Sequence, residues 1–255
     1  MAVGLVASAG GGSGASAAWV APPAGGGHAL FRWINGHPTP LGDAVFGQLS
    51  GLGDGLVAAL VCTVLLLARP RAGAAGLAAF AVSGLLAQAL KRLFDAPRPP
   101  AVLDHVHVLG QALTAHSFPS GHATTSGAML TLMLLAWPRA WAAWLAAAAY
   151  LLAAVGRVYG GVHWPLDVAA GLLLGAATML VVWRASAAWP VARWAASPWW
   201  ARVAGMGALV QAGALGLGYR IQPSTARPLA VAMALLAALF VWRCWRRRDG
   251  CQGMV

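Results

Sequence analysis

Three short segments of this chain carry the residues whose types and spacing could support chemistry. They read KRLFDAPRP from Lys91 to Pro99, PSGH from Pro119 to His122, and RVYGGVHWPLD from Arg157 to Asp167. Arginine and lysine bind anions, and a histidine with a carboxylate partner can attack an electrophile or transfer a proton. The three segments together therefore predict a site at which a histidine acts on an anionic group.

The third segment has the most specific pattern. His163 and Asp167 are four residues apart, so they share one face if a helix begins near this point. An Asp in that position can accept the Nδ1 proton of the imidazole, which fixes the tautomer and leaves Nε2 free to attack. Arg157 adds a planar guanidinium suited to phosphate oxygens. A lone His–Asp pair is more often structural, so the catalytic interpretation depends on the cations that accompany it.

The other two segments predict an anion-binding frame. Ser120 is a good helix cap at the start of an apolar stretch, and Gly121 lets a ligand approach the backbone. The free N–H groups at such a helix start attract anions. Lys91 and Arg98 bracket a proline-rich turn, and Lys91 is the only lysine in the chain. Taken alone, each segment is also compatible with an ordinary capped helix or with basic residues at a membrane edge.

The elements that position these segments are predicted to lie in a bilayer. Hydrophobic residues make up 60% of the 255 residues and charged residues only 9%, against about 25% charged residues in soluble domains. The apolar residues also form long blocks, as membrane spans do. The net charge of +11 comes mostly from single or paired basic residues between these blocks, which is typical of membrane flanks and not of a nucleic-acid-binding face.

We expect an all-α, polytopic helical membrane protein with about six or seven spans. Residues Ala29 to Leu52 mix apolar and polar side chains, which favours a helix lying in the membrane interface. Seven apolar stretches approach the roughly 20 residues that a span needs. They run from about Gly55 to Ala68, Ala72 to Phe94, Gly121 to Trp137, Ala140 to Tyr159, Leu166 to Trp183, Val203 to Gly218, and Leu229 to Trp242.

Basic residues indicate how the chain is oriented. If the first span runs inward, ten basic residues fall on the cytoplasmic side and seven on the outer side. Lys91, Arg98 and Arg157 are among the seven, and the bias becomes ten to four when these candidate site residues are set aside. All three chemical segments then lie at helix ends on the outer side. We therefore expect an integral protein of the cell (inner) membrane with its site facing the periplasm or the outside.

In this order and at these spacings, the segments resemble the type 2 phosphatidic-acid phosphatases, a family that shares its core with the vanadium haloperoxidases. The family pattern is K-x6-R-P, then P-S-G-H, then S-R-x5-H-x3-D. This chain has Lys91, Arg98 and Pro99, then Pro119 to His122, then Arg157, His163 and Asp167. Gly156 stands where the family usually has Ser, which we expect to remove a phosphate hydrogen bond or to alter packing without abolishing activity. The resemblance covers about Ala29 to Trp183.

The resemblance implies a helical-bundle phosphatase core and a phospho-histidine mechanism. His163 would attack phosphorus, Asp167 would orient it, and His122 would protonate the leaving group and then activate water. The phosphoryl oxygens would be held by Lys91, Arg98, Ser120, Gly121 and Arg157. No cofactor and no metal is expected, because the cations supply the charge and the chain has no Glu and few Asp for a two-metal site.

The chain is expected to divide into three parts. Residues 1–27 form a low-complexity segment that lacks a basic n-region, so no cleaved signal peptide is expected. Residues 28–185 form the phosphatase core, with the interfacial helix and five spans. Residues 186–255 hold a C-terminal pair of spans and a basic tail.

The implied partner is a lipid phosphate within the bilayer, such as undecaprenyl diphosphate, phosphatidic acid or phosphatidylglycerol phosphate. A lipid phosphotransferase would use the same residues and stays open as an alternative. A transporter or flippase is less favoured, because the charges gather at one membrane face and the hydropathy pattern does not repeat. His105, His107 and His116 could bind a metal in the outer loop, although loop histidines are more often solvated. No nucleic-acid partner is expected, and the residues carry no signal of oligomeric state.

Overall fold

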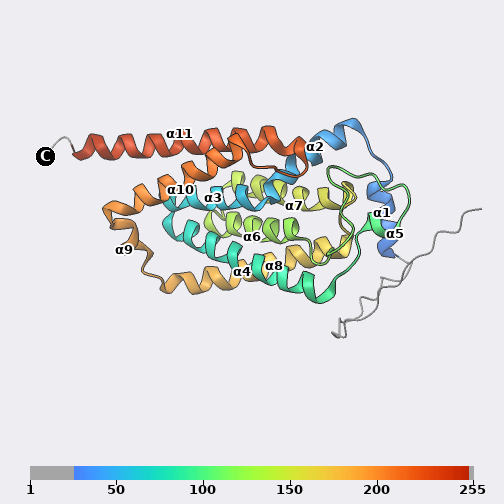
Figure 1. The fold of residues 1–255 in the computed structure, drawn as a ribbon. Coiled ribbons are helices and arrows are strands. Elements are labelled where there is room, and N and C mark those ends of the chain that lie inside the picture. Colours follow the sequence, from blue (N-terminus) through green and yellow to red (C-terminus); the bar gives the residue numbers. More distant parts are fainter. Residues whose placement is uncertain (1–25, 253–255) are drawn as a thin grey trace, which may run out of the picture.

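The computed structural model of the protein describes residues 26–252, and within them it contains helices and no strand (Figure 1). The predicted low-complexity segment, 1–27, lies almost entirely outside the described residues. The long helices are α3 (Gly55–Ala68), α4 (Pro70–Phe94), α6 (Gly121–Ala136), α7 (Trp141–Tyr159), α8 (Pro165–Ala185), α10 (Pro198–Leu217) and α11 (Arg227–Gln252). The short ones are α1 (Gly26–Asn35), α2 (Pro40–Ser50), η1 (Gly51–Gly53), α5 (Pro99–Val102), η2 (Ser186–Ala188), α9 (Val191–Ala196) and η3 (Ser224–Ala226).

Each of the seven apolar stretches forms one of the long helices, so the prediction of an all-α polytopic membrane protein is confirmed. Capping residues set the helix starts: the Asp54 carboxylate accepts the Leu56 and Val57 N–H groups at 2.8 and 3.3 Å, and prolines open α4, α8 and α10. Four helices are long and apolar enough to cross a membrane, or five if Pro40–Gly53 and Gly55–Ala68, bent by 58°, form one broken span. The count of six or seven spans stays a prediction.

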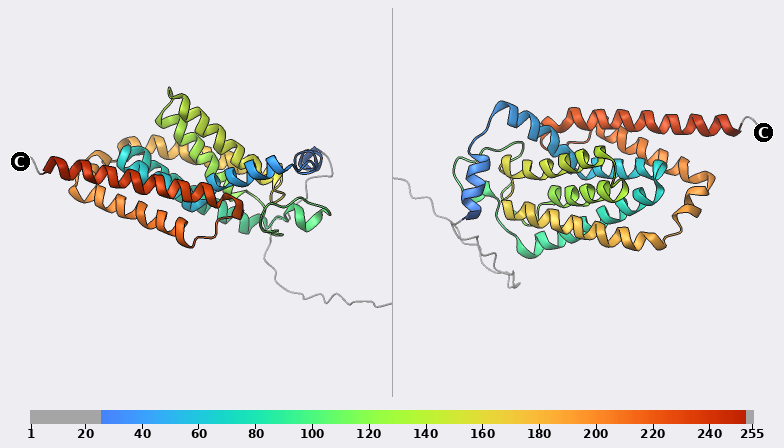
Figure 2. Two further views of the ribbon diagram at one scale, coloured as in Figure 1. Left: turned by 90° about the horizontal axis from the view of Figure 1, so that it is seen from above. Right: turned by 180° about the vertical axis from the view of Figure 1, so that it is seen from behind.

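The interfacial segment differs from the expected single helix over Ala29 to Leu52. It forms α1 and α2, separated by a break at 36–39. Pro38 and Pro40 explain the break, because proline lacks an N–H and disfavours helical backbone in the residue before it. Thr39 then caps α2, its hydroxyl accepting the Gly42 N–H at 3.0 Å. Helix α1 lies across the end of the bundle, whereas α2 leads toward α3 (Figures 1 and 2).

Helix α6 forms the centre of the bundle and packs against α4, α7 and α8. Its contact with α8 is unusually close: a Cβ atom added to Gly175 would lie 2.0 Å from the Thr124 carbonyl oxygen, and one added to Gly127 would lie 2.2 Å from that of Leu172. Only glycine permits this backbone approach. The Ser120 N–H also donates to the Asp167 carbonyl at 3.0 Å, so the starts of α6 and α8 are held together.

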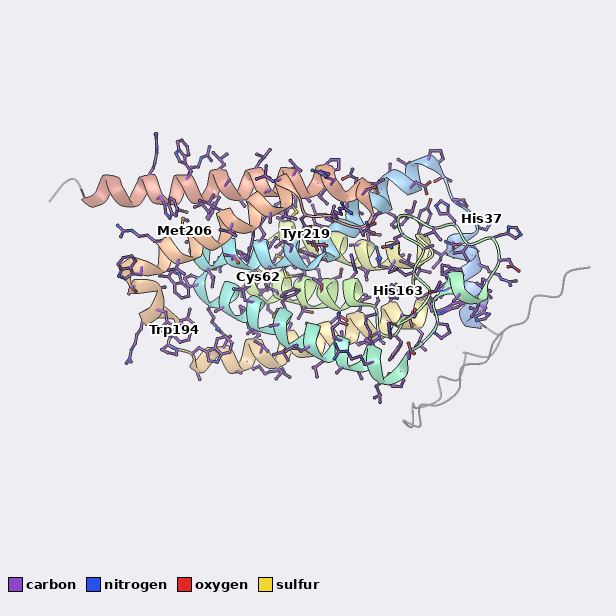
Figure 3. All side chains as sticks on the ribbon, viewed as in Figure 1. His37, Cys62, His163, Trp194, Met206 and Tyr219 are labelled. Atoms are coloured by element: carbon purple, nitrogen blue, oxygen red, sulfur yellow. The ribbon has the colours of Figure 1, made fainter. Side chains whose placement is uncertain are left out.

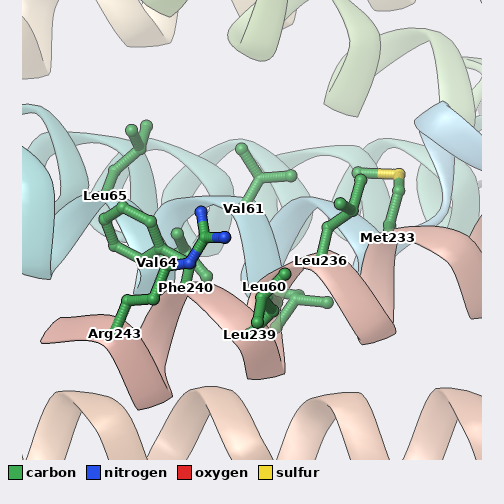
Figure 4. Close-up of a pocket in the computed structure, with 10 residues that line it drawn as sticks. Leu60, Val61, Val64, Leu65, Met233, Leu236, Leu239, Phe240 and Arg243 are labelled. Atoms are coloured by element: carbon green, nitrogen blue, oxygen red, sulfur yellow. The ribbon is translucent and has the colours of Figure 1, made fainter. Parts of the chain in front are cut away.

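The C-terminal pair, α10 and α11, packs on the outer side of α3. An apolar groove of about 440 Å³ runs between α3 and α11, with Arg243 at one end (Figure 4). It is lined mainly by leucine, valine and phenylalanine side chains, which suits contact with lipid acyl chains. The groove shares no residue with the three chemical segments.

Candidate active site

The three predicted segments meet at one end of the bundle. His163 lies there, in the loop between α7 and α8, whereas α9 and the end of α11 lie at the opposite end (Figures 1 and 3). Lys91 belongs to the last turn of α4, Arg157 to the last turn of α7, and Asp167 to the first turn of α8. With the start of α6 at Ser120 and Gly121, helix termini from four elements thus converge on one place, together with the loop between α5 and α6.

His163 is held by two oxygen-bearing side chains. Its Nδ1 lies 3.4 Å from Asp167 Oδ2 and 3.4 Å from the Ser117 hydroxyl oxygen. Asp167 Oδ2 also accepts the Trp164 N–H at 2.9 Å and a short hydrogen bond from the Ser117 hydroxyl. Ser117 was not predicted from the sequence, because it lies 46 positions before His163 and only the folded loop brings the two side chains together.

The tautomer of His163 follows from its other neighbour. Arg98 Nη1 lies 3.1 Å from His163 Nε2, and a guanidinium has donors but no acceptor. Nε2 must therefore be the unprotonated nitrogen, and the ring proton sits on Nδ1, facing Asp167. This is the tautomer that a nucleophilic Nε2 requires.

The surroundings of His163 also keep its ring neutral. Burial lowers the pKa of His163 well below its ordinary value, and the positive charges of Arg98, Arg157 and Lys91 act in the same direction. A neutral imidazole has a lone pair to offer at pH values where a solvated histidine would be partly protonated. The surroundings of His163 thus favour a neutral imidazole over a protonated one.

Lys91 and Arg98 fasten the loop that carries Ser117. Lys91 Nζ donates to the His116 carbonyl at 2.7 Å, and Arg98 donates to the carbonyls of Ala115 and Val162 at 2.8 and 2.9 Å. These carbonyls leave both charges without a balancing anion. The proline-rich turn is held in place as well, because the Trp164 indole donates to the Pro97 carbonyl at 3.0 Å.

The three cations are buried without carboxylate partners. Lys91, Arg98 and Arg157 are 9%, 7% and 7% exposed, and none forms a salt bridge with a carboxylate within residues 26–252. Arg157 Nε and His122 Nε2 are buried and have no hydrogen-bond partner among the described residues. Buried charge of one sign is costly unless a counter-ion balances it. The arrangement is therefore suited to an anion with several oxygens.

The start of α6 places Ser120 and Gly121 beside these groups. Ser120 is fully buried, and its hydroxyl caps α6 by accepting the Ala123 N–H at 3.4 Å. A Cβ atom added to Gly121 would meet no atom within 4 Å, so the backbone there borders open space. Gly121 offers a ligand close access to the helix start, whereas Ser120 already has a structural partner.

Two of the three outer-loop histidines have acidic partners. His107 Nε2 lies 2.9 Å from an Asp43 oxygen, and His116 Nδ1 lies 2.9 Å from an Asp95 oxygen. The Tyr159 hydroxyl donates to Asp43 at 2.8 Å, which ties α7 to α2. Within the described residues, no group of three or more His, Cys, Asp or Glu side chains is arranged to hold a metal ion. His107 and His116 thus serve to order the loops.

Gly156 precedes Arg157 and packs closely against α2. A Cβ atom added to it would lie 3.2 Å from Phe46 Cδ1 and 3.4 Å from the Ser50 hydroxyl oxygen. Ser50 is itself buried. A side chain at position 156 would therefore compete with Phe46 and Ser50 for space, so the glycine suits the packing of α2 on α7.

Comparison with known proteins agrees with this geometry. A profile of the PAP2 superfamily matches residues 72–190. An undecaprenyl-diphosphatase from Sulfolobus acidocaldarius is 32% identical over 148 residues, which cover 57% of this chain and 71% of that protein. This chain belongs to the PAP2 superfamily. The matched residues include all three segments of the candidate site, and they end before α10 and α11.

Other matches of this PAP2 protein differ in how much of each chain they cover. A lipid A 1-phosphatase from Rhizobium johnstonii is 43% identical over 102 residues, which cover 37% of this chain and 39% of that relative. Among solved structures, Aquifex aeolicus LpxE aligns with a TM-score of 0.58 and 30% identity, covering 62% of this chain and 94% of that one. A transmembrane PAP2-type phosphatidylglycerolphosphate phosphatase from Bacillus subtilis has the same fold, with a TM-score of 0.50 and 22% identity over 60% of this chain and 81% of that one.

Proposed function

We propose that this protein hydrolyses a phosphomonoester or diphosphate on a lipid or polyprenyl carrier through a phospho-histidine intermediate at His163. One observation carries the proposal: within residues 26–252, three buried cations form no salt bridge with a carboxylate, and one of them, Arg98, contacts a histidine whose Nε2 is unprotonated and whose Nδ1 faces Asp167. The cations suit a phosphoryl group, and the histidine suits attack on its phosphorus.

In the first step, the lone pair of His163 Nε2 forms a bond to phosphorus. The bond between phosphorus and the lipid oxygen breaks, and that oxygen takes a proton from His122. Asp167 and Ser117 stabilise the positive charge that develops on the His163 ring. Lys91, Arg98 and Arg157 balance the negative charge on the phosphoryl oxygens, which is the role that metal ions take in many other phosphoryl-transfer sites.

In the second step, water attacks phosphorus and gives its proton to His122. The bond between phosphorus and His163 Nε2 breaks, and the ring returns to its starting form. The products are inorganic phosphate and either a lipid alcohol or a lipid monophosphate. His122 therefore acts first as an acid and then as a base, and it is restored at the end of each cycle.

The substrate class and the location follow from the same arrangement. The candidate site lies at one end of a bundle of apolar helices, where the head group of an amphiphile meets its hydrocarbon chain. The names of the relatives, lipid A 1-phosphatase and undecaprenyl-diphosphatase, favour such amphiphiles. We place the protein in the inner membrane with the site facing the periplasm or the outside, because the basic residues favour the opposite end as cytoplasmic.

The proposal is tested with purified protein in detergent. Phosphate release is measured from undecaprenyl diphosphate, phosphatidic acid, phosphatidylglycerol phosphate and lipid A, each with and without EDTA. We expect release from at least one of them, unaffected by EDTA. His37→Ala, a histidine change at an exposed position, serves as the control and should retain full activity.

Two results would contradict the proposal. One is the absence of phosphate release from all four lipids by well-folded protein, and the other is strict dependence on an added metal ion. Transfer of the phosphoryl group to a second lipid, with little inorganic phosphate formed, would instead identify a phosphotransferase built on the same site.

A further inference from the structure

The groove between α3 and α11 has a single charged side chain among its apolar lining. From α11 it is lined by Met233, Leu236, Phe240 and Arg243, which are three or four residues apart and so share one face of the helix. Leucine and valine side chains of α3 line the opposite wall. Both helices lie outside residues 72–190, which the family profile matches. The groove is therefore not part of the matched phosphatase core.

The position of Arg243 along α11 corresponds to the level of lipid phosphates. The segment Ser224–Arg246 is long and apolar enough to cross a membrane. Arg243 lies 16 residues after Arg227, where α11 begins, which is about 24 Å along the helix axis. Because the hydrocarbon core of a bilayer is about 30 Å thick, a helix that begins at one interface brings Arg243 close to the other. The neighbouring Trp242 is exposed and lies under the Arg246 guanidinium at 4.4 Å, as aromatic and basic side chains do at an interface.

The apolar part of the groove is as long as one leaflet of a bilayer is thick. Met233 and Arg243 lie at opposite ends of the groove (Figure 4). They are ten residues apart, which corresponds to about 15 Å of helix, or half of the hydrocarbon core. Leu236 and Leu239 are 66% and 42% exposed, so a ligand can enter from the side of the bundle. The groove thus fits a hydrocarbon chain that ends in a polar group at Arg243.

Charge determines which polar group suits this end of the groove. Arg243 is exposed and forms neither a salt bridge nor a cation–π contact with any of the described residues. Its guanidinium matches the geometry of phosphate oxygens. The residues that line the groove include no acidic side chain that could hold the amine of a zwitterionic head group. The sequence from Cys244 to Gln252 adds three arginines and one aspartate, so this end of the helix favours a head group of net negative charge.

We propose that the groove between α3 and α11 binds one anionic phospholipid, with its phosphate on Arg243 and an acyl chain along Leu236 toward Met233. The lipid fills the space between the two helices and supplies the negative charge that Arg243 lacks. It is a phosphodiester that is retained and not hydrolysed. The inference goes beyond the proposed function and does not depend on it, because the groove shares no residue with the candidate active site.

The test compares phosphatidylglycerol with phosphatidylcholine of the same chain length. Purified full-length protein in a non-ionic detergent at about 0.15 M salt is mixed with either lipid, and the bound lipid is counted by native mass spectrometry. We expect the first phosphatidylglycerol to bind about tenfold more tightly than phosphatidylcholine, and Arg243→Gln to remove this preference. Arg202→Gln makes the same change at an exposed arginine of the same end that does not line the groove. It should keep the affinity for phosphatidylglycerol within about twofold.

Two further variants separate the acyl chain and the active site from the head group. Leu236→Gln places a polar amide along the acyl chain, so it should weaken the binding of both lipids alike. His163→Ala should bind phosphatidylglycerol as the wild type does.

Four results would overturn the inference. They are equal binding of the two lipids by the wild type, an unchanged preference in Arg243→Gln, loss of phosphatidylglycerol binding in His163→Ala, and a protein dimer that forms in place of the lipid complex. Unchanged binding by Leu236→Gln would contradict the proposed path of the acyl chain. Protein that binds phosphatidylglycerol selectively but releases no phosphate would contradict the proposed function alone, so the two failures are distinguishable.

Discussion

The two ends of the bundle use arginine in opposite ways. At the end away from the site, Arg69, Arg71, Arg202 and Arg246 are exposed, and each lies over a tryptophan ring at 4.8, 4.6, 5.5 and 4.4 Å from its centroid. Aromatic and basic side chains of this kind anchor a protein at a membrane interface. At the site end, Lys91, Arg98 and Arg157 are buried, and in the described part of the chain none of them makes a cation–π contact or forms a salt bridge with a carboxylate.

The exposed arginines suit anchoring at a membrane interface, whereas the buried cations suit the binding of an anion. Exposed arginines keep most of their hydration and cost the fold little, whereas buried cations without counter-ions weaken it. A fold retains such cations where a ligand supplies the missing negative charge, and active sites commonly give up stability in this way. Changes at the site end should therefore affect activity strongly, and matched changes at the other end should not.

The largest effect is expected from His163→Ala. Loss of the proposed nucleophile should lower kcat by at least about 10⁴-fold, because the covalent intermediate is proposed to form on its Nε2. Phosphate release and thermal unfolding of the detergent-solubilised protein are measured together. Wild-type-like turnover by the folded variant would show that His163 is not the nucleophile.

The sharpest contrast between the two ends comes from one substitution made at each. Arg157→Met should lower kcat/KM about 10³-fold, as expected when a cation that stabilises the transition state is lost. The same change should leave the Tm of ligand-free protein unchanged or raise it, because a buried charge has been removed. Arg71→Met, at the opposite end, should keep kcat/KM within about twofold. Equal losses of activity in the two variants would break the comparison.

A smaller effect is expected from Ser117→Ala. Ser117 bonds to Asp167 and lies beside His163 Nδ1, so its removal should loosen the histidine without removing a reacting group. We expect kcat to fall about tenfold, in the range typical of residues that orient another group. Steady-state rates on the best substrate provide the measurement, and an unchanged kcat would reduce Ser117 to a packing role.

The smallest expected effect is a shift in the pH dependence of kcat/KM between the wild type and Arg157→Met. His163 must be neutral to attack, and its pKa is lowered by burial and by the nearby cations. The acidic limb of kcat/KM should therefore lie below about pH 6.5, the ordinary value for histidine. In Arg157→Met, one of the cations that lower this pKa is gone, so the limb should move to higher pH. A limb above pH 6.5 in the wild type would contradict the effect of the cations.

The helices of the molecule could be predicted from the sequence, because the sequence patterns that indicate them are local. The seven apolar stretches and the proline and serine at helix starts each depend on a few adjacent residues. The break at 36–39 also has a local cause, and the expected continuous helix over Ala29 to Leu52 was wrong because Pro38 and Pro40 interrupt it. The roles assigned to Lys91, Arg98, Arg157 and the two histidines stay predictions until activity is measured.

The rest depended on contacts between distant residues. Ser117 reaches Asp167 over 50 positions, and Tyr219 reaches Asp54 over 165. No spacing rule connects residues so far apart, because the folded loops alone set these distances. The same holds for His107 and His116, whose acidic partners Asp43 and Asp95 become evident only in three dimensions.

The central claim is that His163 becomes phosphorylated during turnover. It is tested most directly by mixing the wild-type protein with ³²P-labelled substrate, quenching in alkali within one turnover, and mapping the label. A phosphate on a histidine nitrogen is stable in alkali and labile in acid. The account predicts such a label on His163 and none in His163→Ala. Continued phosphate release without any labelled protein, or a label on a different residue such as His122, would contradict it.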